Sequence, residues 1–381
     1  MPCVRAVSVA GVLAALAVSG PCWFAAPAAA DVVELLCTAS AQSCSVTPLR
    51  PAPASIPAPT GTHRVGRIDA HLADGGRELM VSAWYPAVAD ERPAPYLPAG
   101  TMTGRAHIAW QASNWLPALA AAPLVGATAP ATWGAAVDPA AGRLPVLVWS
   151  PGLGTPRWLG SGLAADLASK GWLVVTVDHT GESPVVEFPG ERIIVGQPVN
   201  ITDREAMRRA LETRVADMRL VLDSLPALPE VGERIDPERI AAAGHSYGGY
   251  TAVLTAARDH RVKAAVVLDG SVAFLEPSEL ERAGVNRPVL VLAAGDMVHA
   301  SWISFGQVTP GPFALATIRS GAHYVSTDLP ALGGTPVLCG TVPPDRAAMI
   351  TRAVTAGFLD KWLHGGPDDY GSWPELDWRT R

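Results

Sequence analysis

The amino-acid sequence predicts a mixed α/β protein in which a mostly parallel central sheet is covered by helices on both faces. From residue 144 onward, short runs that are apolar at nearly every position alternate with helix-like segments. Two longer segments carry apolar residues at spacings of three and four, as amphipathic helices do. Runs that are apolar on both faces and separated by helices are typical of buried parallel strands.

The first thirty residues have the pattern of a secretory signal peptide. After Arg5 the chain is uncharged from residue 6 to residue 30, and three alanines ending at Ala30 precede Asp31. The unbroken apolar segment is shorter than the roughly 20 residues that a membrane-spanning helix needs, so a membrane anchor is the weaker interpretation. We expect cleavage after Ala30 and a secreted or periplasmic protein.

Residues 31–62 predict a strap rich in proline and alanine, followed by one main domain over residues 63–381. Five prolines lie between residues 47 and 60, which favours an extended segment. Once the signal peptide is removed, Cys37, Cys44 and Cys339 remain, and an odd number leaves one cysteine unpaired or shared between chains. A Cys37–Cys44 bridge is the simplest pairing, with Cys339 as a competing partner.

The main domain is expected to begin with a hairpin, because residues 64–72 and 77–84 flank the turn-forming segment 74–76. Helix-like segments are predicted over residues 158–169 and 247–258. Strand-like apolar runs are predicted at residues 144–149, 172–177, 240–243, 264–268, 289–293 and 313–318.

Two further helices are marked by their ends and by their apolar residues. Thr202 and Glu205 predict a capping box at the start of the first, and Gly365 with Gly366 ends the second, which covers residues 344–364. Both apolar stripes are expected to pack in the core. They consist of Met207, Leu211, Val215, Met218, Leu222 and Leu225 in the first helix, and Ile350, Val354, Phe358 and Trp362 in the second.

An insertion over residues 106–137 contains no Asp, Glu, Lys or Arg. Its prolines at positions 117, 123 and 130 exclude a spanning helix. Trp110, Trp115, Leu116 and Leu119 suit either an apolar lid or a surface that contacts lipid. An ordinary packing insertion is the interpretation we favour.

The composition excludes several classes of function. With 49% hydrophobic residues and a net charge of −6, the chain is not a disordered tail. Only three lysines are present, and no basic stripe could neutralise a nucleic-acid backbone, so we expect no nucleic-acid partner. No metal-ligand spacing or nucleotide-binding glycine loop occurs, so we expect neither a metal nor a cofactor. The sequence leaves the oligomeric state open.

The most informative segment is Gly-His-Ser-Tyr-Gly at residues 244–248. A strand that ends in G-x-S-x-G and enters a helix forms a nucleophile elbow, whose sharp turn lifts the hydroxyl of Ser246 above the sheet. Glycines are needed at 244 and 248 because side chains there would collide. The pattern alone is modest evidence, but here an apolar run precedes it and a helix-like segment follows, so we interpret Ser246 as a nucleophile.

A serine nucleophile needs a base, and in this type of fold the chain order is serine, acid, histidine. That order restricts the base to His299, His323 or His364. His323 lies in a loop directly after the last predicted strand, where the base belongs, and is our choice. His364 closes a helix, where a capping role is sufficient, and His299 is interpreted as structural.

Two carboxylates are candidates for the acid, because Asp269 and Asp296 each follow the end of a predicted strand, and spacing does not choose between them. The oxyanion requires two N–H donors. Tyr247, directly after the nucleophile, supplies one. Pro151 has no N–H, so Leu153 is the better candidate for the other donor. His245 and His179 are interpreted as packing or hydrogen-bonding residues near the site.

Four segments together resemble the platelet-activating-factor acetylhydrolase-like branch of the α/β-hydrolase superfamily. They are LPVLVWSPGLGTPR at 144–157, GHSYGG at 244–249, LDG at 268–270 and TIRSGAHYVSTD at 317–328. The resemblance covers roughly residues 64–364. It implies Asp269 as the acid, and Leu153 and Tyr247 as the oxyanion donors. Pro151 departs from the His-Gly pair that is usual in that family.

The sequence therefore predicts a secreted serine hydrolase that cleaves a small-molecule or lipid-like carboxylic ester through an acyl-enzyme. Its expected triad is Ser246, Asp269 and His323. The family name does not fix phospholipid as the substrate, because the branch includes bacterial esterases and lipases. Two alternatives stay open: a serine peptidase or amidase on the same fold, and a binding protein that has kept the fold without activity.

Overall fold

The computed structural model describes residues 33–37, 44–48, 55–88, 90–272, 278–295 and 299–380. The predicted signal peptide at 1–30 lies outside these residues. The chain divides into two units, Met1–Ala52 and Pro53–Arg381. In the first unit, β1 (Val33–Cys37) and β2 (Cys44–Pro48) form an antiparallel pair. Their register pairs the backbone of Cys37 with that of Cys44, and the disulfide between them stays a prediction.

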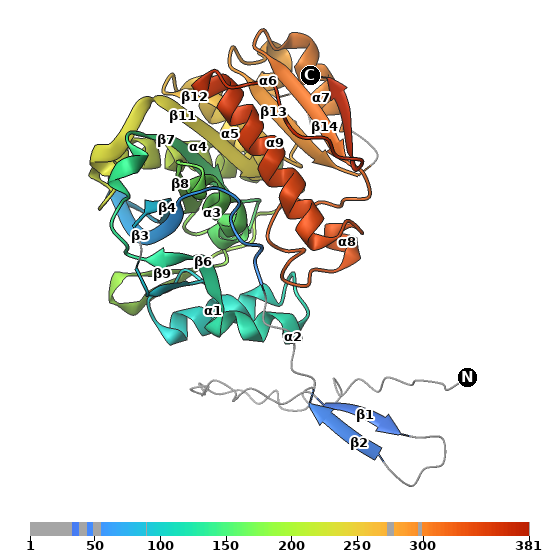
Figure 1. Cartoon of the computed structure of the whole chain (residues 1–381). Coiled ribbons are helices and arrows are strands. Elements are labelled where there is room, and N and C mark those ends of the chain that lie inside the picture. The colour runs from blue at the N-terminus through green and yellow to red at the C-terminus, as the bar shows by residue number, and fades with distance from the viewer. Residues whose placement is uncertain are drawn as a thin grey trace. The chain divides into compact units, whose positions relative to one another are not determined.

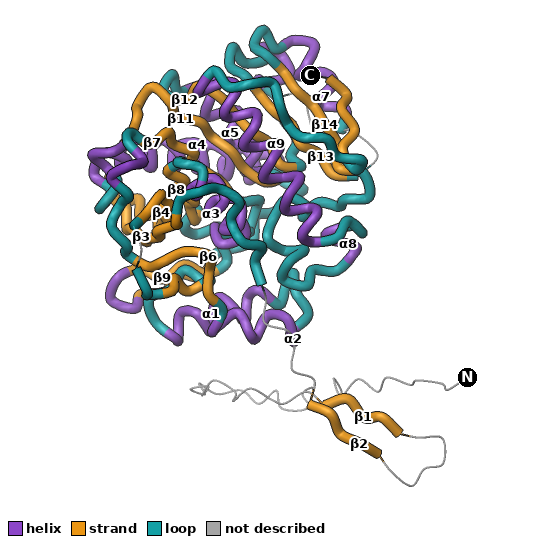
Figure 2. Tube along the Cα trace, in the orientation of Figure 1, coloured by secondary structure: helices purple, strands orange, loops and turns teal. Residues whose placement is uncertain are grey.

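The second unit is built on an eleven-stranded sheet, whose strands are coloured orange in Figure 2. Its strands, in their order across the sheet, are β15 (Leu376–Thr380), β14 (Phe313–Ile318), β13 (Val289–Ala294), β12 (Val262–Leu268), β11 (Ile235–His245), β7 (Leu144–Ser150), β8 (Leu173–Asp178), β4 (Arg77–Ala87), β3 (Arg64–Asp74), β6 (Thr128–Trp133) and β5 (Pro93–Pro95). A separate antiparallel pair is formed by β9 (Val185–Phe188) and β10 (Arg192–Val195).

The centre of the sheet is parallel and its margins are partly antiparallel. Strands β8, β7, β11, β12, β13 and β14 pair in parallel. Antiparallel pairing joins β4 to both β3 and β8, and β15 to β14. The strand–turn–helix at the end of β11 lies in the middle of this sheet. The protein has the α/β-hydrolase fold, which confirms the predicted fold class.

Helices bury both faces of the sheet, and the central strands divide their side chains between two cores. In β7, Leu147 and Trp149 face one core while Val146 and Val148 face the other, as the two-residue period of a strand requires. The helices of the first core are α1 (Met102–Ala112), α2 (Ala118–Ala121), α3 (Ser161–Ser169), α8 (Pro336–Cys339) and α9 (Pro344–His364).

The second core contains the helices α4 (Arg204–Ser224), α5 (Tyr247–Arg258), α6 (Glu279–Ala283) and α7 (Ala300–Val308). Figure 1 shows α9 crossing β11, β12 and β13, against which it packs. The 3-10 turns of the described chain are η1 (Ala122–Gly126), η2 (Pro139–Ala141), η3 (Arg157–Gly160), η4 (Pro189–Glu191), η5 (Leu225–Ala227) and η6 (Gly232–Arg234).

Several predicted elements have different bounds or partners in the structure. Helix α4 is capped by Asp203, whose carboxylate accepts from the N–H groups of Glu205 and Ala206, so the predicted Thr202 cap is wrong. Thr202 donates its hydroxyl to Asn200 instead. The predicted helix over 158–169 is the turn η3 followed by α3. Strand β15, which extends the sheet beyond β14, was not predicted.

The apolar stripes lie in the core as predicted, with one exception. All six residues of the first stripe are buried, five of them in α4 and Leu225 in η5, as are Ile350, Val354 and Phe358 of α9. Trp362 is 37% exposed, because it lies near the end of α9 and stacks with the ammonium of Lys361. The predicted helix end is found at Gly365, which adopts a left-handed conformation with φ of 69°.

The two regions before the central strands are more closely tied to the domain than predicted. The second half of the strap contacts α3 and α9: Thr60 donates to Asp166, and Arg352 donates to the carbonyls of Pro57 and Ala58. The apolar insertion ends in β6, which pairs with β3 and β5. In the described part of the chain, no helix is both long and apolar enough to cross a membrane.

Candidate active site

The predicted nucleophile elbow is present between β11 and α5. β11 ends at His245, α5 begins at Tyr247, and Ser246 between them has a φ of 55°, a left-handed conformation that is uncommon outside glycine. A Cβ at Gly248 would overlap the carbonyl oxygens of Ser150 and Pro151, and one at Gly244 would overlap the backbone of Gly248. The two glycines therefore let the strand and the helix approach β7 closely enough to form the turn.

The structure brings Ser246, His323 and Asp269 into one hydrogen-bonded chain. The Ser246 Oγ lies 2.8 Å from His323 Nε2, and His323 Nδ1 lies 2.6 Å from Asp269 Oδ2. The His323 side chain is 45% exposed and that of Asp269 is 20% exposed. The imidazole is therefore partly open to solvent, while the carboxylate is more sheltered.

Asp269 is held at the end of β12 by its own backbone and by the next strand. Its φ is 45°, its N–H donates to the carbonyl of Leu292, and its Oδ1 accepts from the N–H of Ala294 at 2.7 Å. The second oxygen is thereby directed to His323. The alternative acid, Asp296, lies outside the described residues.

The other two candidate bases lie at different places in the fold. His299 caps α7 by accepting from the N–H of Ser301. His364, at the end of α9, pairs with Asp360 and packs against Trp172. Both therefore have the structural positions that the sequence indicated for them.

His245 contacts the loop that carries His323. Its Nε2 lies 2.7 Å from the carbonyl oxygen of His323, and its ring packs at 4.7 Å from the His323 ring and 4.9 Å from that of Tyr324. Burial, together with the nearby charge of His323, lowers the pKa of His245 to about 4. His245 is therefore neutral at pH 7, and because a carbonyl only accepts, its single N–H lies on Nε2.

The loop after β7 lies against the elbow. A Cβ built on Gly152 would stand 3.3 Å from Cβ of Ser246, so the backbone of this loop passes within van der Waals reach of the serine. Leu153 is the next residue along the loop. Tyr247 is the first residue of α5, where N–H groups point out of the helix at its positive end. Both predicted oxyanion donors thus belong to segments that adjoin Ser246.

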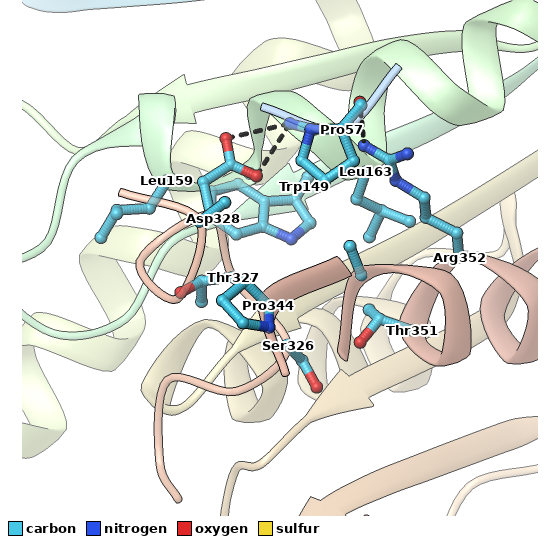
Figure 3. A pocket seen from close by; sticks show the side chains of 14 residues that line it. Pro57, Trp149, Leu159, Leu163, Ser326, Thr327, Asp328, Pro344, Thr351 and Arg352 are labelled. Carbon is cyan, nitrogen blue, oxygen red and sulfur yellow. Dashed lines mark hydrogen bonds between the residues drawn. The ribbon is translucent and has the colours of Figure 1, made fainter. Parts of the chain in front are cut away.

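The loop beyond His323 is anchored by a buried carboxyl group, Asp328. Its two oxygens accept from the N–H of Gly162, and one also accepts from the hydroxyl of Tyr96. Asp328 lines a cavity of about 20 Å³. Figure 3 shows its carboxyl group together with Trp149 and Ser326, which also line the cavity. Burial raises the pKa of Asp328 to about 7.

Sequence reasoning missed a set of charged residues behind the loop after β7. Arg214 donates to the carbonyl oxygens of Pro151 and Gly152 and pairs with Glu182. A usable signal was present, since Arg214 lies three residues after Leu211, on the apolar stripe of α4. A charge on a buried stripe requires a partner. Among the described residues, no group of three or more His, Cys, Asp or Glu side chains could hold a metal ion.

The sequence matches the family described as platelet-activating factor acetylhydrolase, isoform II, over residues 51–191 and 207–307. The match includes Ser246 and Asp269 and ends before His323. Among curated proteins, a probable 1-alkyl-2-acetylglycerophosphocholine esterase of Arthroderma benhamiae is 25% identical over 350 residues, which cover 81% of this chain and 88% of that protein. A platelet-activating factor acetylhydrolase of Gallus gallus is 23% identical, covering 84% and 86%.

Among solved structures, a ferulic acid esterase from Streptomyces cinnamoneus superimposes with a TM-score of 0.72 at 33% sequence identity, covering 86% of this chain and all of that one. The names of these relatives all describe the hydrolysis of carboxylic esters. The family match extends over more than half of the chain and contains the elbow with its serine. The chain is therefore a member of the platelet-activating factor acetylhydrolase, isoform II, family of α/β-hydrolases.

Proposed function

We propose that this protein is a secreted serine hydrolase that cleaves carboxylic esters of small or lipid-like molecules through an acyl-enzyme. The observation that carries the proposal is the continuous contact from Ser246 Oγ through the His323 ring to the Asp269 carboxylate. Two close contacts in the order serine, histidine, acid are the geometry that a serine nucleophile needs. Membership of an esterase family supports the reaction class.

In the first half-reaction, the Ser246 Oγ attacks the ester carbonyl carbon while His323 Nε2 takes the hydroxyl proton. Asp269 accepts the Nδ1–H of His323 and stabilises the imidazolium that forms. The N–H groups of Leu153 and Tyr247 hold the oxyanion. His323 then gives its proton to the departing alkoxide as the C–O bond breaks. The alcohol dissociates, and Ser246 remains as an acyl-serine.

In the second half-reaction, a water molecule repeats the attack. His323 takes a proton from the water as its oxygen bonds to the acyl carbon, and the oxyanion is held at the same two N–H groups. The bond to Ser246 Oγ breaks, the serine oxygen recovers its proton from His323, and the carboxylic acid is released.

Labelling with a fluorophosphonate probe tests the nucleophile and separates the enzyme from a silent binding protein. We expect the wild type to be labelled and Ser246→Ala to be unlabelled, with turnover of an ester lowered on the order of 10⁴- to 10⁶-fold. Ser304→Ala, which removes an exposed serine of α7, is the matched control and should behave as the wild type. An unlabelled wild type, or equal labelling of Ser246→Ala, would refute the proposal.

The substrate class is tested with matched pairs of substrates. Hydrolysis of 4-nitrophenyl esters is measured beside that of aminoacyl anilides, and faster cleavage of the anilides would assign the protein to the peptidases or amidases instead. Among esters, the relatives suggest two acyl groups, acetyl on a glycerophosphocholine and feruloyl. Measuring kcat/KM for a series of esters with acetyl to long acyl chains, and for methyl ferulate, shows which acyl group the protein prefers.

The protein is also proposed to contact a lipid surface transiently, through exposed apolar side chains of α1 and α2. Met102, Trp110 and Leu119 of α1 and α2 are 58%, 70% and 47% exposed. We expect the protein to co-sediment with phosphatidylcholine vesicles, and Trp110→Ser with Leu119→Ser to abolish this while activity on a soluble ester persists. Equal co-sedimentation of wild type and variant would contradict it.

Secretion is tested by sequencing the N-terminus of the exported protein, which should begin at Asp31. A mature protein that retains residues before Asp31 would contradict the proposed cleavage site.

A further inference from the structure

A second serine, histidine and carboxylate are aligned behind the loop that follows β7. The Ser150 Oγ lies 2.8 Å from His179 Nε2, and His179 Nδ1 lies 2.9 Å from Asp217 Oδ2. The order of groups repeats that of Ser246, His323 and Asp269. Here, however, Ser150 is 0% exposed, and His179 and Asp217 are each 1% exposed, so no substrate reaches this serine.

The protons of this second set can be assigned from its partners. Burial, followed by the charge of Arg214, lowers the pKa of His179, so its ring is neutral. Burial alone would raise the pKa of Asp217, but hydrogen bonds from Arg77 and His179 outweigh it and hold the pKa below its ordinary value. Asp217 therefore only accepts, His179 carries its proton on Nδ1, and Ser150 donates its hydroxyl to Nε2.

Arg214 joins this set to the backbone of the loop. Its Nη1 donates to Ser150 Oγ at 3.2 Å and to the carbonyl of Pro151 at 2.7 Å, and its Nη2 donates to the carbonyl of Gly152 at 2.7 Å. The hydroxyl of Ser150 donates to His179 and its oxygen accepts from Arg214, so Ser150 is one of the groups that hold the guanidinium in place. The guanidinium in turn fixes two consecutive carbonyls.

The other side of Leu153 is held through the partner of Arg214. Glu182 pairs with the Arg214 guanidinium and accepts from the N–H of Gly154 at 2.9 Å. The residues before and after Leu153 are thus both bound to the same buried ion pair. A second ion pair, between Arg77 and Asp217, balances the charge of the set. Buried charges that are fully paired in this way hold their neighbours in one geometry.

We propose that Ser150, His179, Asp217 and Arg214 are positioning residues that set the direction of the Leu153 N–H toward the oxyanion. The inference rests on the proposed function, because it assigns a task within that reaction. Residue 151 is a proline and supplies no N–H, so one of the two donors depends on how the following residues are held. When a donor is displaced from the oxyanion, the transition state loses more stabilisation than the bound substrate does. The value of kcat therefore falls while KM changes little.

The test compares an ester with the thionoester that has the same acyl and alcohol groups. A thionoester develops charge on sulfur, which is larger than oxygen and a poor acceptor, so it gains little from a correctly placed oxyanion donor. The measured quantity is the ratio of kcat/KM for the ester to that for the thionoester. A variant that merely lowers the fraction of folded enzyme lowers both values equally and leaves the ratio unchanged.

We expect Ser150→Ala to lower this ratio about tenfold, since small displacements of a catalytic group cost one to two orders of magnitude. Arg214→Lys keeps the charge beside Glu182 but loses the planar fork, and should lower the ratio at least as much. Ser169→Ala is the matched control. Ser169 is also a buried serine, but it lies at the far end of α3, where it donates to Asp166 and accepts from Gly61.

The outcomes distinguish failure of the positioning role from failure of the proposed function. An unchanged ratio in Ser150→Ala and Arg214→Lys, with both substrates slowed alike, would overturn the positioning role and leave the proposed function intact. A ratio that falls equally in Ser169→Ala would also overturn it. Should Ser150→Ala be insoluble, Arg214→Lys alone decides by the same ratio. The proposed function itself, and this inference with it, would be refuted if the wild type hydrolyses neither substrate although its far-ultraviolet circular dichroism spectrum is that of a folded protein.

Discussion

Replacing His245 with phenylalanine tests whether the residue before Ser246 holds His323, the proposed catalytic base, in place. Phenylalanine keeps an aromatic ring beside those of His323 and Tyr324, although its six-membered ring is larger than imidazole. It removes the single N–H that donates to the His323 carbonyl at 2.7 Å. The substitution thus deletes one hydrogen bond and adds some volume at a buried position, which His245→Gln avoids.

The magnitude follows from that bond. A hydrogen bond between neutral groups contributes about 0.5–1.5 kcal/mol, and about 1.4 kcal/mol corresponds to a factor of ten. If the bond holds the His323 ring at its distance from Ser246, its loss should lower kcat about tenfold with KM nearly unchanged. His245→Gln, whose amide N–H reaches about as far as Nε2 of the imidazole, should recover part of the lost turnover.

The assay is the steady-state hydrolysis of a 4-nitrophenyl ester, with thermal unfolding measured on the same samples. His364→Phe is the matched control, since that ring also packs on an aromatic side chain and pairs through one nitrogen, but at the end of α9. A wild-type kcat in His245→Phe would refute the reasoning. So would an equal loss in His364→Phe, or a glutamine variant as slow as the phenylalanine variant although both are folded.

Three further predictions concern the acid, the elbow and the buried carboxyl group. Asp269→Asn should lower kcat at least about 10³-fold, because the amide does not stabilise the imidazolium, whereas Asp296→Asn should retain activity; the reverse result in the same ester assay would reassign the acid. Gly248→Ala should destabilise the fold by about 3 kcal/mol or more, because its methyl group would overlap backbone carbonyls, and an unchanged urea midpoint would contradict this. Burial raises the pKa of Asp328 to about 7 in the folded protein, so ionisation of this group opposes folding. Its ionisation costs no stability in acid, where the group is protonated in both the folded and unfolded states. The free energy of unfolding falls as the pH rises from the ordinary carboxyl range, and the loss is complete above about pH 7. Wild type should therefore lose up to about 4 kcal/mol of stability relative to Asp328→Asn between pH 4 and pH 8, and parallel stability curves for the two proteins would show that the carboxyl group does not titrate in that range.

The fold and the central contacts of the site could be predicted because each depends on a short stretch of sequence. The apolar runs define buried strands, and the elbow motif fixes Ser246 to the end of one of them. Parallel strands end at the same edge of a sheet, so residues that follow β12 and β14 are brought toward that serine. This is why Asp269 and His323, far apart in the chain, could both be named as candidates.

Other features depend on competition between similar residues, which a single sequence does not resolve. Thr202 and Asp203 are both good helix caps. In the structure the carboxylate of Asp203 accepts from the first N–H groups of α4, while the threonine hydroxyl donates to Asn200. Strand β15 is short and joins the edge of the sheet, where its partner β14 decides whether it forms. Its apolar pattern alone is too brief to distinguish it from a loop.

The network around Arg214 was missed for a different reason. Its members come from β7, from the segment after β8 and from α4, and they meet through long side chains whose directions follow from tertiary packing. Sequence patterns report which residues are buried more readily than which buried polar groups bind one another. Arg214 and Asp217 could have been marked as charges on an apolar helix face, but their partners could not have been named.

The two serine–histidine–aspartate sets show what a pattern of residue types leaves undecided about chemistry. Both have hydrogen bonds of 2.9 Å or less in the same order. Ser150 ends a regular strand, is fully buried and accepts from a guanidinium, so its oxygen has neither access to a substrate nor a free direction of attack. Ser246 has a left-handed backbone conformation and a histidine that is nearly half exposed. The strained turn and the open face, more than the identity of the three side chains, therefore distinguish the proposed catalytic set from the proposed supporting set.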